Sequence, residues 1–318
     1  MFWQSLYFSF SVTGPICILL FLGYFLKRIK FFNDAFVDIA SKLVFKVTLP
    51  ALLFLSIVNS DKTVEINATY IAFGLVANIA FFLFITLACK LCIKDKQNHG
   101  VIIQGGFRSN TAIIGLAYVA NVYGDSGVAL AAVYVAFTTV LYNILAVICL
   151  TPTQSKFGLA GLQDLLRSIA KNPLIIGIML GVLCLTLNIK LPTVLVSTGQ
   201  YFANMTLPLA LLCTGATLNL SALRSDGSHA WFASVFKLLL APILITGSAY
   251  LWGFSQLEVG LLFFMTAAPT AAASYVMARS MGGNADLAAN IIATTTAGSI
   301  ITCSVGISIL HSVHFFPS

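Results

Sequence analysis

Long apolar runs, separated by short polar connections, make up almost the whole chain. Ten such segments can be drawn, most of them close to the roughly 20 residues that a helix needs to cross a bilayer. They cover Phe8–Leu26, Phe36–Val58, Tyr70–Leu91, Val101–Tyr123, Gly127–Leu150, Pro173–Leu187, Val194–Leu218, Ala230–Trp252, Val259–Met281 and Leu287–Leu310. The pattern predicts an all-α polytopic membrane protein with ten transmembrane helices.

Two of these segments contain residues that a continuous membrane helix avoids. The ninth has Pro269 and Thr270 among alanines, and the fourth has the polar run Arg108, Ser109, Asn110 and Thr111. Irregular backbone at membrane depth survives only where protein buries it or where it lines a wet cavity. A matched pair of interrupted helices, one in each half of a chain, indicates the substrate site of a transporter. We therefore expect broken helices in segments four and nine, and we expect them to cross; a simple proline kink at Pro269 is the alternative.

The two halves of the chain share residues at a constant spacing. Thr48-Leu49-Pro50 recurs 158 positions later as Thr206-Leu207-Pro208, and the same offset carries Pro15 onto Pro173 and Gly23 onto Gly181. Five segments per half is an odd number, so a second copy would enter the membrane from the opposite side. Chance similarity between leucine-rich helices is the alternative. We expect two inverted five-helix repeats, residues 1–152 and 153–318.

Basic residues in the connections predict the orientation in the membrane. One set of alternate connections holds Lys27, Arg28, Lys30, Lys90, Lys94, Lys96, Lys156, Arg167, Lys171, Arg224 and Arg279. The opposite set holds only Lys62 and Lys190. Cytoplasmic loops carry an excess of Lys and Arg, so both termini are expected on the non-cytoplasmic side of the cell (inner) membrane. The net charge of +7 is then explained by orientation in a bilayer and not by nucleic-acid binding.

The connection between the halves, Thr151–Asn172, has apolar residues at helical spacing among charged ones. It is expected to form either a short amphipathic helix on the cytoplasmic surface or a plain linker.

Composition supports a membrane protein and argues against an enzyme. Hydrophobic residues make up 59% of the chain and charged residues 8%, whereas soluble domains carry about 25% charged residues. All seven cysteines lie in or beside apolar segments, which predicts no disulfide framework. The four histidines lie near segment ends, and no nucleophile–base pair or nucleotide motif can be assembled. We expect no metal site, no cofactor and no catalysis.

Four basic residues remain inside the predicted spans: Lys42, Lys46, Arg108 and Lys237. A charge at that depth costs about 3 kcal/mol, so it is paired, extended to an interface, or used in function. Lys42 and Lys46 lie near the cytoplasmic end, and Asp38 precedes Lys42 by one helical turn, so snorkelling or an ion pair is expected. Lys237 lies seven residues into its segment, within expected reach of the cytoplasmic interface.

Arg108 differs because it lies beside a predicted break. Its guanidinium can hold a carboxylate through two parallel hydrogen bonds, and the free N–H groups of a broken helix also favour an anion. The alternatives are that it reaches the cytoplasmic surface or satisfies carbonyls freed at the break. Asn143, beside Tyr142 in segment five, is expected either to bond a neighbouring helix or to face the cavity.

The candidate substrate-binding residues are therefore Arg108, Ser109, Asn110, Thr111, Tyr142, Asn143, Pro269 and Thr270. Structural residues at or near helix breaks are expected to be Pro50, Pro208, Gly105, Gly106 and Gly115.

Several motifs, in order along almost the whole chain, resemble the auxin efflux carrier family. They include Leu22-Gly23-Tyr24, Leu49-Pro50, Phe107-Arg108-Ser109-Asn110, Leu207-Pro208-Leu209-Ala210-Leu211, Lys237-Leu238 and Ala268-Pro269. The resemblance implies a ten-helix inverted-repeat fold like that of sodium/proton antiporters and bile-acid carriers. It further implies a scaffold of helices 1, 2, 6 and 7, a transport unit of helices 3–5 and 8–10, and a homodimer through the scaffold as one possible assembly.

These observations predict a secondary transporter that moves a small organic carboxylate across the bilayer by alternating access. Export is favoured because a negative cell interior expels an anion. Two alternatives stay open: a sodium- or proton-coupled symporter of the same fold, and a membrane sensor that binds its ligand without moving it.

Overall fold

The chain folds into a bundle of helices. The computed structural model describes residues 2–59, 67–151, 171–189, 191–218, 227–312 and 315. Its α-helices are α1 (Phe2–Arg28), α2 (Asp34–Leu43), α3 (Leu49–Val58), α4 (Ala68–Cys92), α5 (His99–Phe107), α6 (Leu116–Leu150), α8 (Pro173–Thr186), α9 (Thr193–Ala216), α10 (Gly227–Val235), α11 (Ala241–Trp252), α12 (Gln256–Ala267), α13 (Ala273–Ser280) and α14 (Ala285–Ser312). Three π-helical turns, Val44–Thr48, Thr111–Gly115 and Phe236–Leu240, and one 3-10 turn, Lys96–Asn98, complete the described elements.

Six helical stretches in the described part are long and apolar enough to cross a membrane, and α8 and α12 are shorter apolar helices. Large apolar side chains such as Phe21, Leu183 and Leu251 are exposed on the outside of the bundle, where lipid would contact them. These features confirm the predicted class, an all-α polytopic membrane protein.

Polar side chains fix where several helices begin. Asn33 caps α2 by accepting from the Phe36 N–H at 2.7 Å, and Asn172 caps α8 by accepting from the Leu174 N–H. Ser255 and Glu258 form a capping box at the start of α12. Each cap satisfies a backbone donor that the first turn of a helix leaves without an intrahelical partner.

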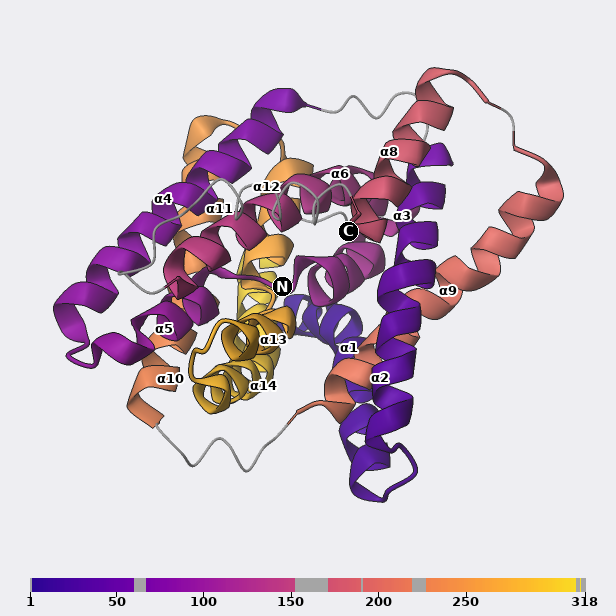
Figure 1. The fold of residues 1–318 in the computed structure, drawn as a ribbon. Helices are drawn as coiled ribbons and strands as arrows, with labels where there is room; N and C mark the ends of the chain where they lie inside the picture. The colour runs from indigo at the N-terminus through magenta and orange to yellow at the C-terminus, as the bar shows by residue number, and fades with distance from the viewer. Residues whose placement is uncertain are drawn as a thin grey trace.

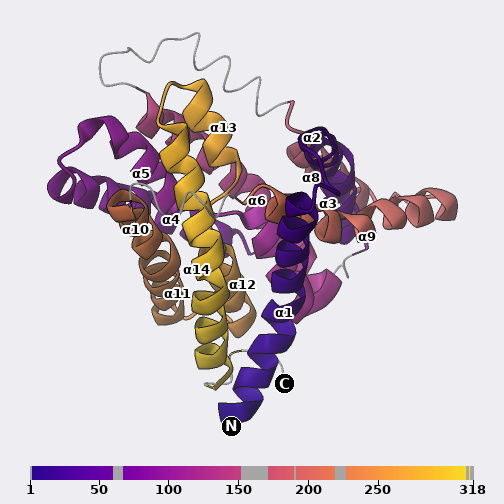
Figure 2. The ribbon, with the colours of Figure 1, turned by 90° about the horizontal axis from the view of Figure 1, so that it is seen from below.

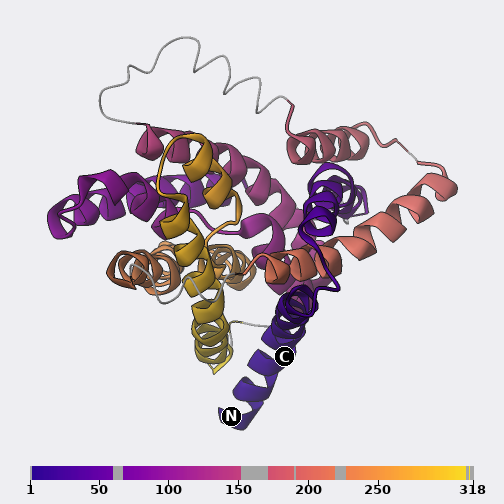
Figure 3. The same cartoon turned by 60° about the horizontal axis from the view of Figure 1, so that its bottom comes forward.

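Figure 1 shows the helices in two groups, with α4, α5, α10 and α11 on one side and α2, α3, α8 and α9 on the other. The turned view in Figure 2 shows the same separation, with α6 and α12 between the groups. Figure 3 shows α1 running beside α14 towards the N-terminus, and the Ser9 hydroxyl donates to the Ser304 carbonyl oxygen at 2.8 Å between these helices. The site described below lies where the two groups meet.

Element bounds recur along the chain at the offset of 158 residues. The stretch Asp34–Val58, shifted by 158, falls on 192–216, and α9 covers Thr193–Ala216. Two glycines with positive φ show the same offset: Gly124 (φ 59°) interrupts α6, and Gly282 (φ 76°) separates α13 from α14. Only glycine adopts such angles without steric cost, so the chain breaks its helical course at corresponding places in each half.

Close helix packing follows the same offset. A Cβ atom on Gly23 of α1 would lie 2.1 Å from the Leu212 carbonyl oxygen of α9. A Cβ atom on Gly181 of α8 would lie 3.1 Å from the Phe54 carbonyl oxygen of α3. Both glycines, and both residues that they face, are 158 positions apart. In the α1–α9 contact the glycine comes from the first half and the facing residue from the second. In the α8–α3 contact the glycine comes from the second half and the facing residue from the first.

Some expectations need correction or fall outside the described part. α9 runs through Pro208 without an end, so Pro208 marks no break; a proline removes one backbone donor, and the helix continues past it. Pro50 follows the π-helical turn Val44–Thr48 inside a continuous helical stretch. The predicted ion pair of Lys42 with Asp38 is confirmed, at 2.6 Å. Residues 152–170 of the connection between the halves lie outside the described residues, as do Lys62, Lys190 and Arg224.

Candidate functional site

Both predicted helix breaks are present. α5 ends at Phe107, Arg108 has extended backbone angles (φ −79°, ψ 101°), and helical structure resumes at Thr111. α12 ends at Ala267 and α13 begins at Ala273. Gly105 and Gly106 form the last turn before the first break, and Gly115 ends the π-helical turn after it.

The two breaks contact each other. Ser109 and Thr270 form an isolated antiparallel bridge, in which the Asn110 N–H donates to the Pro269 carbonyl oxygen at 2.7 Å and the Ala271 N–H donates to the Arg108 carbonyl oxygen at 3.0 Å. Each break therefore supplies backbone partners for the other, as irregular backbone at membrane depth requires.

Thr270 makes two further hydrogen bonds at the crossing. Its hydroxyl donates to the Gly105 carbonyl oxygen at 2.6 Å, and its N–H donates to the Thr295 hydroxyl at 3.2 Å. Thr294, Thr295 and Thr296 also bond carbonyls one turn back in α14. Pro269 and Thr270 thus hold the two breaks together instead of lining the cavity beside them.

A cavity of about 80 Å³ lies against the crossing. It is lined by Phe45, Arg108, Ser109, Asn110, Thr111, Ala112, Ile113, Thr139, Tyr142, Leu174, Ala271, Ala272 and Ala273. Two parts of this lining are the starts of helical segments: the residues from Thr111 and the residues leading into α13. The N–H groups of a first turn have no intrahelical acceptor and carry partial positive charge. Both starts therefore favour an anion in the cavity.

Arg108 adds a full positive charge to this lining. The residue is only 7% exposed, so it does not reach the surface. Its Nη2 donates to Asn143 Oδ1 at 2.8 Å, and its Nη1 lies against the Met277 sulfur. The ion pairs within the described residues join Lys27 with Asp34 and Lys42 with Asp38, so no described carboxylate pairs with Arg108. A guanidinium has five N–H donors, and a buried one without an acid favours a negatively charged ligand.

Tyr142 is held by a buried hydrogen-bond network that the sequence did not reveal. Asn78 Nδ2 donates to the Gly74 carbonyl oxygen at 2.7 Å and to the Tyr134 hydroxyl at 2.9 Å. The carbonyl can only accept, so the amide nitrogen must face it, and Asn78 Oδ1 accepts from the Tyr142 hydroxyl at 2.9 Å. The Tyr142 proton is therefore committed to Asn78, and its oxygen keeps only acceptor capacity for other groups.

Lys237 does not reach an interface, contrary to expectation. Its side chain is fully buried, and its ammonium donates to the Thr266 carbonyl oxygen near the end of α12. In a continuous helix the Thr270 N–H would donate to this carbonyl. At the break it donates to the Thr295 hydroxyl instead. Burial of a long, flexible lysine could not be read from its sequence position, because its reach allows either outcome.

The structure brings most of the predicted residues together. Arg108, Ser109, Asn110, Thr111 and Tyr142 line the cavity, and Asn143 contacts it through Arg108. Asn78 and the alanines Ala271 and Ala272 were not among the predicted site residues. Asn78 could have been identified because it is a polar residue within an apolar span. The two alanines could not, because they contribute backbone groups and their side chains do not distinguish them.

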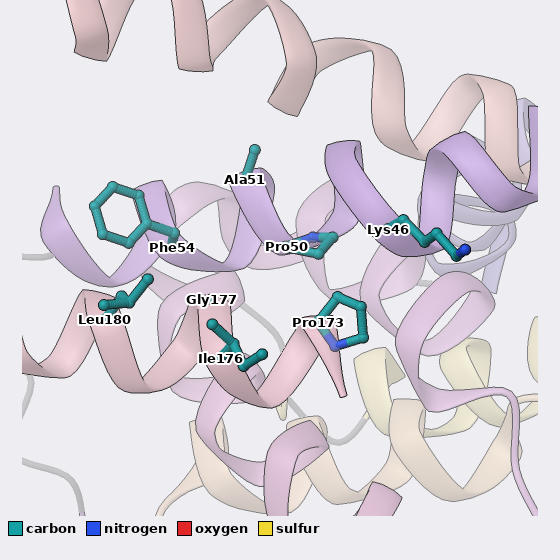
Figure 4. Close-up of a pocket in the computed structure, with 8 residues that line it drawn as sticks. All are labelled: Lys46, Pro50, Ala51, Phe54, Pro173, Ile176, Gly177 and Leu180. Atoms are coloured by element: carbon teal, nitrogen blue, oxygen red, sulfur yellow. The ribbon is translucent and has the colours of Figure 1, made fainter. Parts of the chain in front are cut away.

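A second, larger cavity lies between α3 and α8 and shares no lining residue with the first. This open groove of about 370 Å³ is lined by Lys46, Pro50, Ala51, Phe54, Pro173, Ile176, Gly177 and Leu180. Figure 4 shows Lys46 beside the Pro173 end, while Phe54 and Leu180 lie towards the other. Its lining is apolar except for one lysine, so the chemistry that could recognise an anion gathers in the smaller cavity.

Comparison with known proteins agrees with a transporter. A family model described as "Membrane transport protein" matches residues 12–159 and 153–307. The chain is 24% identical to an "Uncharacterized transporter" of Methanothermobacter thermautotrophicus, over 92% of this chain and 96% of that protein. It is 25% identical to the "Uncharacterized transporter YfdV" of Escherichia coli K12, over 74% and 77% of the two chains.

The name of a third relative includes a substrate. The chain is 23% identical to a Rhizobium meliloti protein named "Putative malonate transporter", over 92% of this chain and 93% of that protein. The family model covers nearly all of the sequence, and the resemblance noted in the motifs is confirmed. The chain belongs to the membrane transport protein family, the family of the auxin efflux carriers.

Proposed function

We propose that this protein carries a small organic carboxylate across the cytoplasmic membrane by alternating access. The observation that carries the proposal is the lining of the smaller cavity. Two helix starts meet there with the buried guanidinium of Arg108, which pairs with none of the described carboxylates. All three place positive potential at one point, which suits a carboxylate.

The opposite ends of the broken helices strengthen this interpretation. The carbonyl of Thr266 in α12 accepts from Lys237, and the carbonyl of Gly105 in α5 accepts from Thr270. The negative partial charge at these C-terminal ends is thus offset by donors of the protein, Lys237 and Thr270. The N–H groups at the N-terminal ends remain available to bind a ligand.

The architecture proposed for this carrier is two inverted five-helix repeats, residues 1–152 and 153–318. The constant offset of 158 in element bounds and the exchanged Gly23 and Gly181 contacts support it. α1, α2, α3, α8 and α9 would then be the scaffold, and α4, α5, α6 and α10–α14 the moving unit. A fixed scaffold and a rocking unit that holds a site at mid-depth give alternating access. The excess of basic residues in alternate connections supports an orientation with both termini on the non-cytoplasmic side.

Malonate is the first substrate to test, because the name of one relative proposes it and because the cavity is small. Each negative charge leaving a cell gains about 2.3 kcal/mol per 100 mV of interior-negative potential. Export therefore requires no coupling ion.

The deciding experiment uses purified protein in proteoliposomes with an imposed membrane potential. We expect saturable malonate flux driven by the potential in the absence of sodium and proton gradients. Flux that follows only a sodium or proton gradient would favour a coupled symporter. Saturable malonate binding without flux under any gradient would favour a sensor. Absence of binding for malonate and for a panel of mono- and dicarboxylates would refute the proposal.

A further inference from the structure

A buried lysine that does not line the anion cavity donates to a carbonyl near the end of α12, next to the second helix break. Lys237 is fully buried in the π-helical turn Phe236–Leu240, and its ammonium bonds the Thr266 carbonyl oxygen. The ion pairs of the described residues do not include it, so its charge is met by carbonyl dipoles. π-helical turns within α-helices occur frequently at functional sites.

The carbonyls at this place are the ones that the break leaves without backbone donors. Thr266 loses its donor because the Thr270 N–H bonds Thr295, and Ala267 loses its donor because the Ala271 N–H bonds Arg108. The Lys237 ammonium donates to the Thr266 carbonyl oxygen in place of the missing N–H. The Cys303 thiol, 3.4 Å from the Ala267 carbonyl oxygen, donates to that carbonyl. Carbonyls at the C-terminal end of a broken helix are the groups that bind a coupling cation in carriers of broken-helix type.

The two halves differ at this point. At the corresponding break of the first half, the freed Gly105 carbonyl accepts from a neutral hydroxyl, that of Thr270. The residue 158 positions before Lys237 is Ile79, which brings no charge. The positive charge is therefore not part of the repeated framework but an addition at the end of α12.

We propose that the Lys237 ammonium is a tethered cation that occupies the position of a coupling ion, so that anion binding at the crossing needs no sodium. The ammonium offsets the negative end of the α12 half-helix. The anion site at the crossing is then electrostatically complete without a dissolved cation. The prediction that anion binding needs no sodium rests on the proposed function. The assignment of the Lys237 ammonium to a cation position does not.

The first test is independent of any substrate. The Lys237→Ala variant removes the ammonium and leaves the freed carbonyls with room for a small cation. We expect methylammonium to raise the thermal-unfolding midpoint of this variant saturably in detergent. Tetramethylammonium, which has no N–H donor, is the matched probe and should not. Wild type and Lys42→Ala, which lacks an exposed lysine, should not respond to methylammonium. Absence of a methylammonium-specific shift in Lys237→Ala would overturn the proposal.

The second test uses malonate binding and does not need the alanine variant to fold. We expect the malonate Kd of wild type to change less than twofold when sodium is replaced by N-methylglucamine. We expect Lys237→Met, which keeps most of the length of the side chain without its charge, to bind malonate at least tenfold more weakly. A sodium requirement in wild type, or unchanged affinity in Lys237→Met, would overturn the proposal. Failure of wild type to bind any carboxylate would instead refute the proposed function, and the methylammonium test would still decide the role of Lys237.

Discussion

The backbone N–H of Asn110 donates to the carbonyl oxygen of Pro269 at 2.7 Å, which joins two helix interruptions from opposite halves of the chain. Pro269 has no N–H of its own, so at this position it can only accept. Asn110 needs an acceptor because its own helix has ended at Phe107. Each interruption thus supplies hydrogen-bond partners to the backbone of the other, which irregular backbone needs where water is absent.

Replacing Thr270 tests how far the crossing stabilises the fold. Thr270→Val leaves the buried Gly105 carbonyl without the hydroxyl that now lies at 2.6 Å. We expect a loss of about 1–3 kcal/mol in the free energy of unfolding, because an orphaned buried acceptor keeps its full desolvation cost. A lowered thermal-unfolding midpoint in detergent would show it, with Thr270→Ser close to wild type. Thr186→Val, which removes an exposed hydroxyl bonded within its own turn, is the control. Equal midpoints for Thr270→Val and Thr186→Val would contradict the role given to Thr270.

Arg108 should dominate anion affinity. Removing a charged hydrogen-bond donor to an anion costs about 1.5–3 kcal/mol, so Arg108→Gln should weaken malonate binding about 10- to 100-fold. Arg108→Lys keeps the charge but loses the planar fork, and we expect an intermediate affinity. Isothermal calorimetry or a ligand-induced thermal shift would measure both variants. Arg279→Gln, at an exposed arginine of α13, should bind malonate like wild type. If Arg108→Gln and Arg279→Gln bind alike, Arg108 is not part of the site.

The sequence revealed the breaks but not all of their surroundings. Arg108 to Thr111 could be identified because polar residues in an apolar span are costly unless they have a local use. Pro208 gave a similar signal, yet α9 continues through it, because a single missing donor is tolerated inside a packed helix. The burial of Lys237 depends on which face of its helix meets α12, and neither the apolar pattern nor the position in the span contains that information.

Close glycine contacts give a stability prediction with an internal control. Gly23→Ala would place a methyl group 2.1 Å from the Leu212 carbonyl oxygen, and the helices can separate only by losing other contacts. We expect a destabilisation of about 1–3 kcal/mol, the usual cost of overpacking. Gly247→Ala, in α11 with no atom within 4 Å of the added methyl, should instead stabilise by about 0.5–1 kcal/mol.

Gly181→Ala tests the counterpart contact. Its added methyl would lie 3.1 Å from the Phe54 carbonyl oxygen, a milder clash. We therefore expect its thermal-unfolding midpoint to fall between those of Gly23→Ala and wild type. Midpoints for Gly23→Ala at or above wild type would mean that α1 and α9 do not pack closely in the membrane protein.

The Asn78 network should behave as one unit with Tyr142. Asn78→Leu leaves the Tyr142 and Tyr134 hydroxyls without their shared amide, so Tyr142 loses the bond that orients it at the cavity. Tyr142→Phe removes the same bond from the other end. Since both changes break one interaction, the double variant should lose less malonate affinity than the two single variants together, with a coupling energy of about 0.5–3 kcal/mol.

Malonate affinity and the thermal-unfolding midpoint of the four proteins in this cycle give two separate readouts. Coupling in affinity as well as in the midpoint is expected if Asn78 positions Tyr142 for the ligand. Coupling in the midpoint alone would make the network purely structural, because orientation of Tyr142 would then leave the anion unaffected. Thr138→Val, at a buried hydroxyl bonded to the Tyr134 and Val135 carbonyls of its own helix, is the control and should show no coupling with Tyr142→Phe in affinity. Additive losses within about 0.5 kcal/mol in both readouts would show that the hydrogen bonds around Asn78 do not act together.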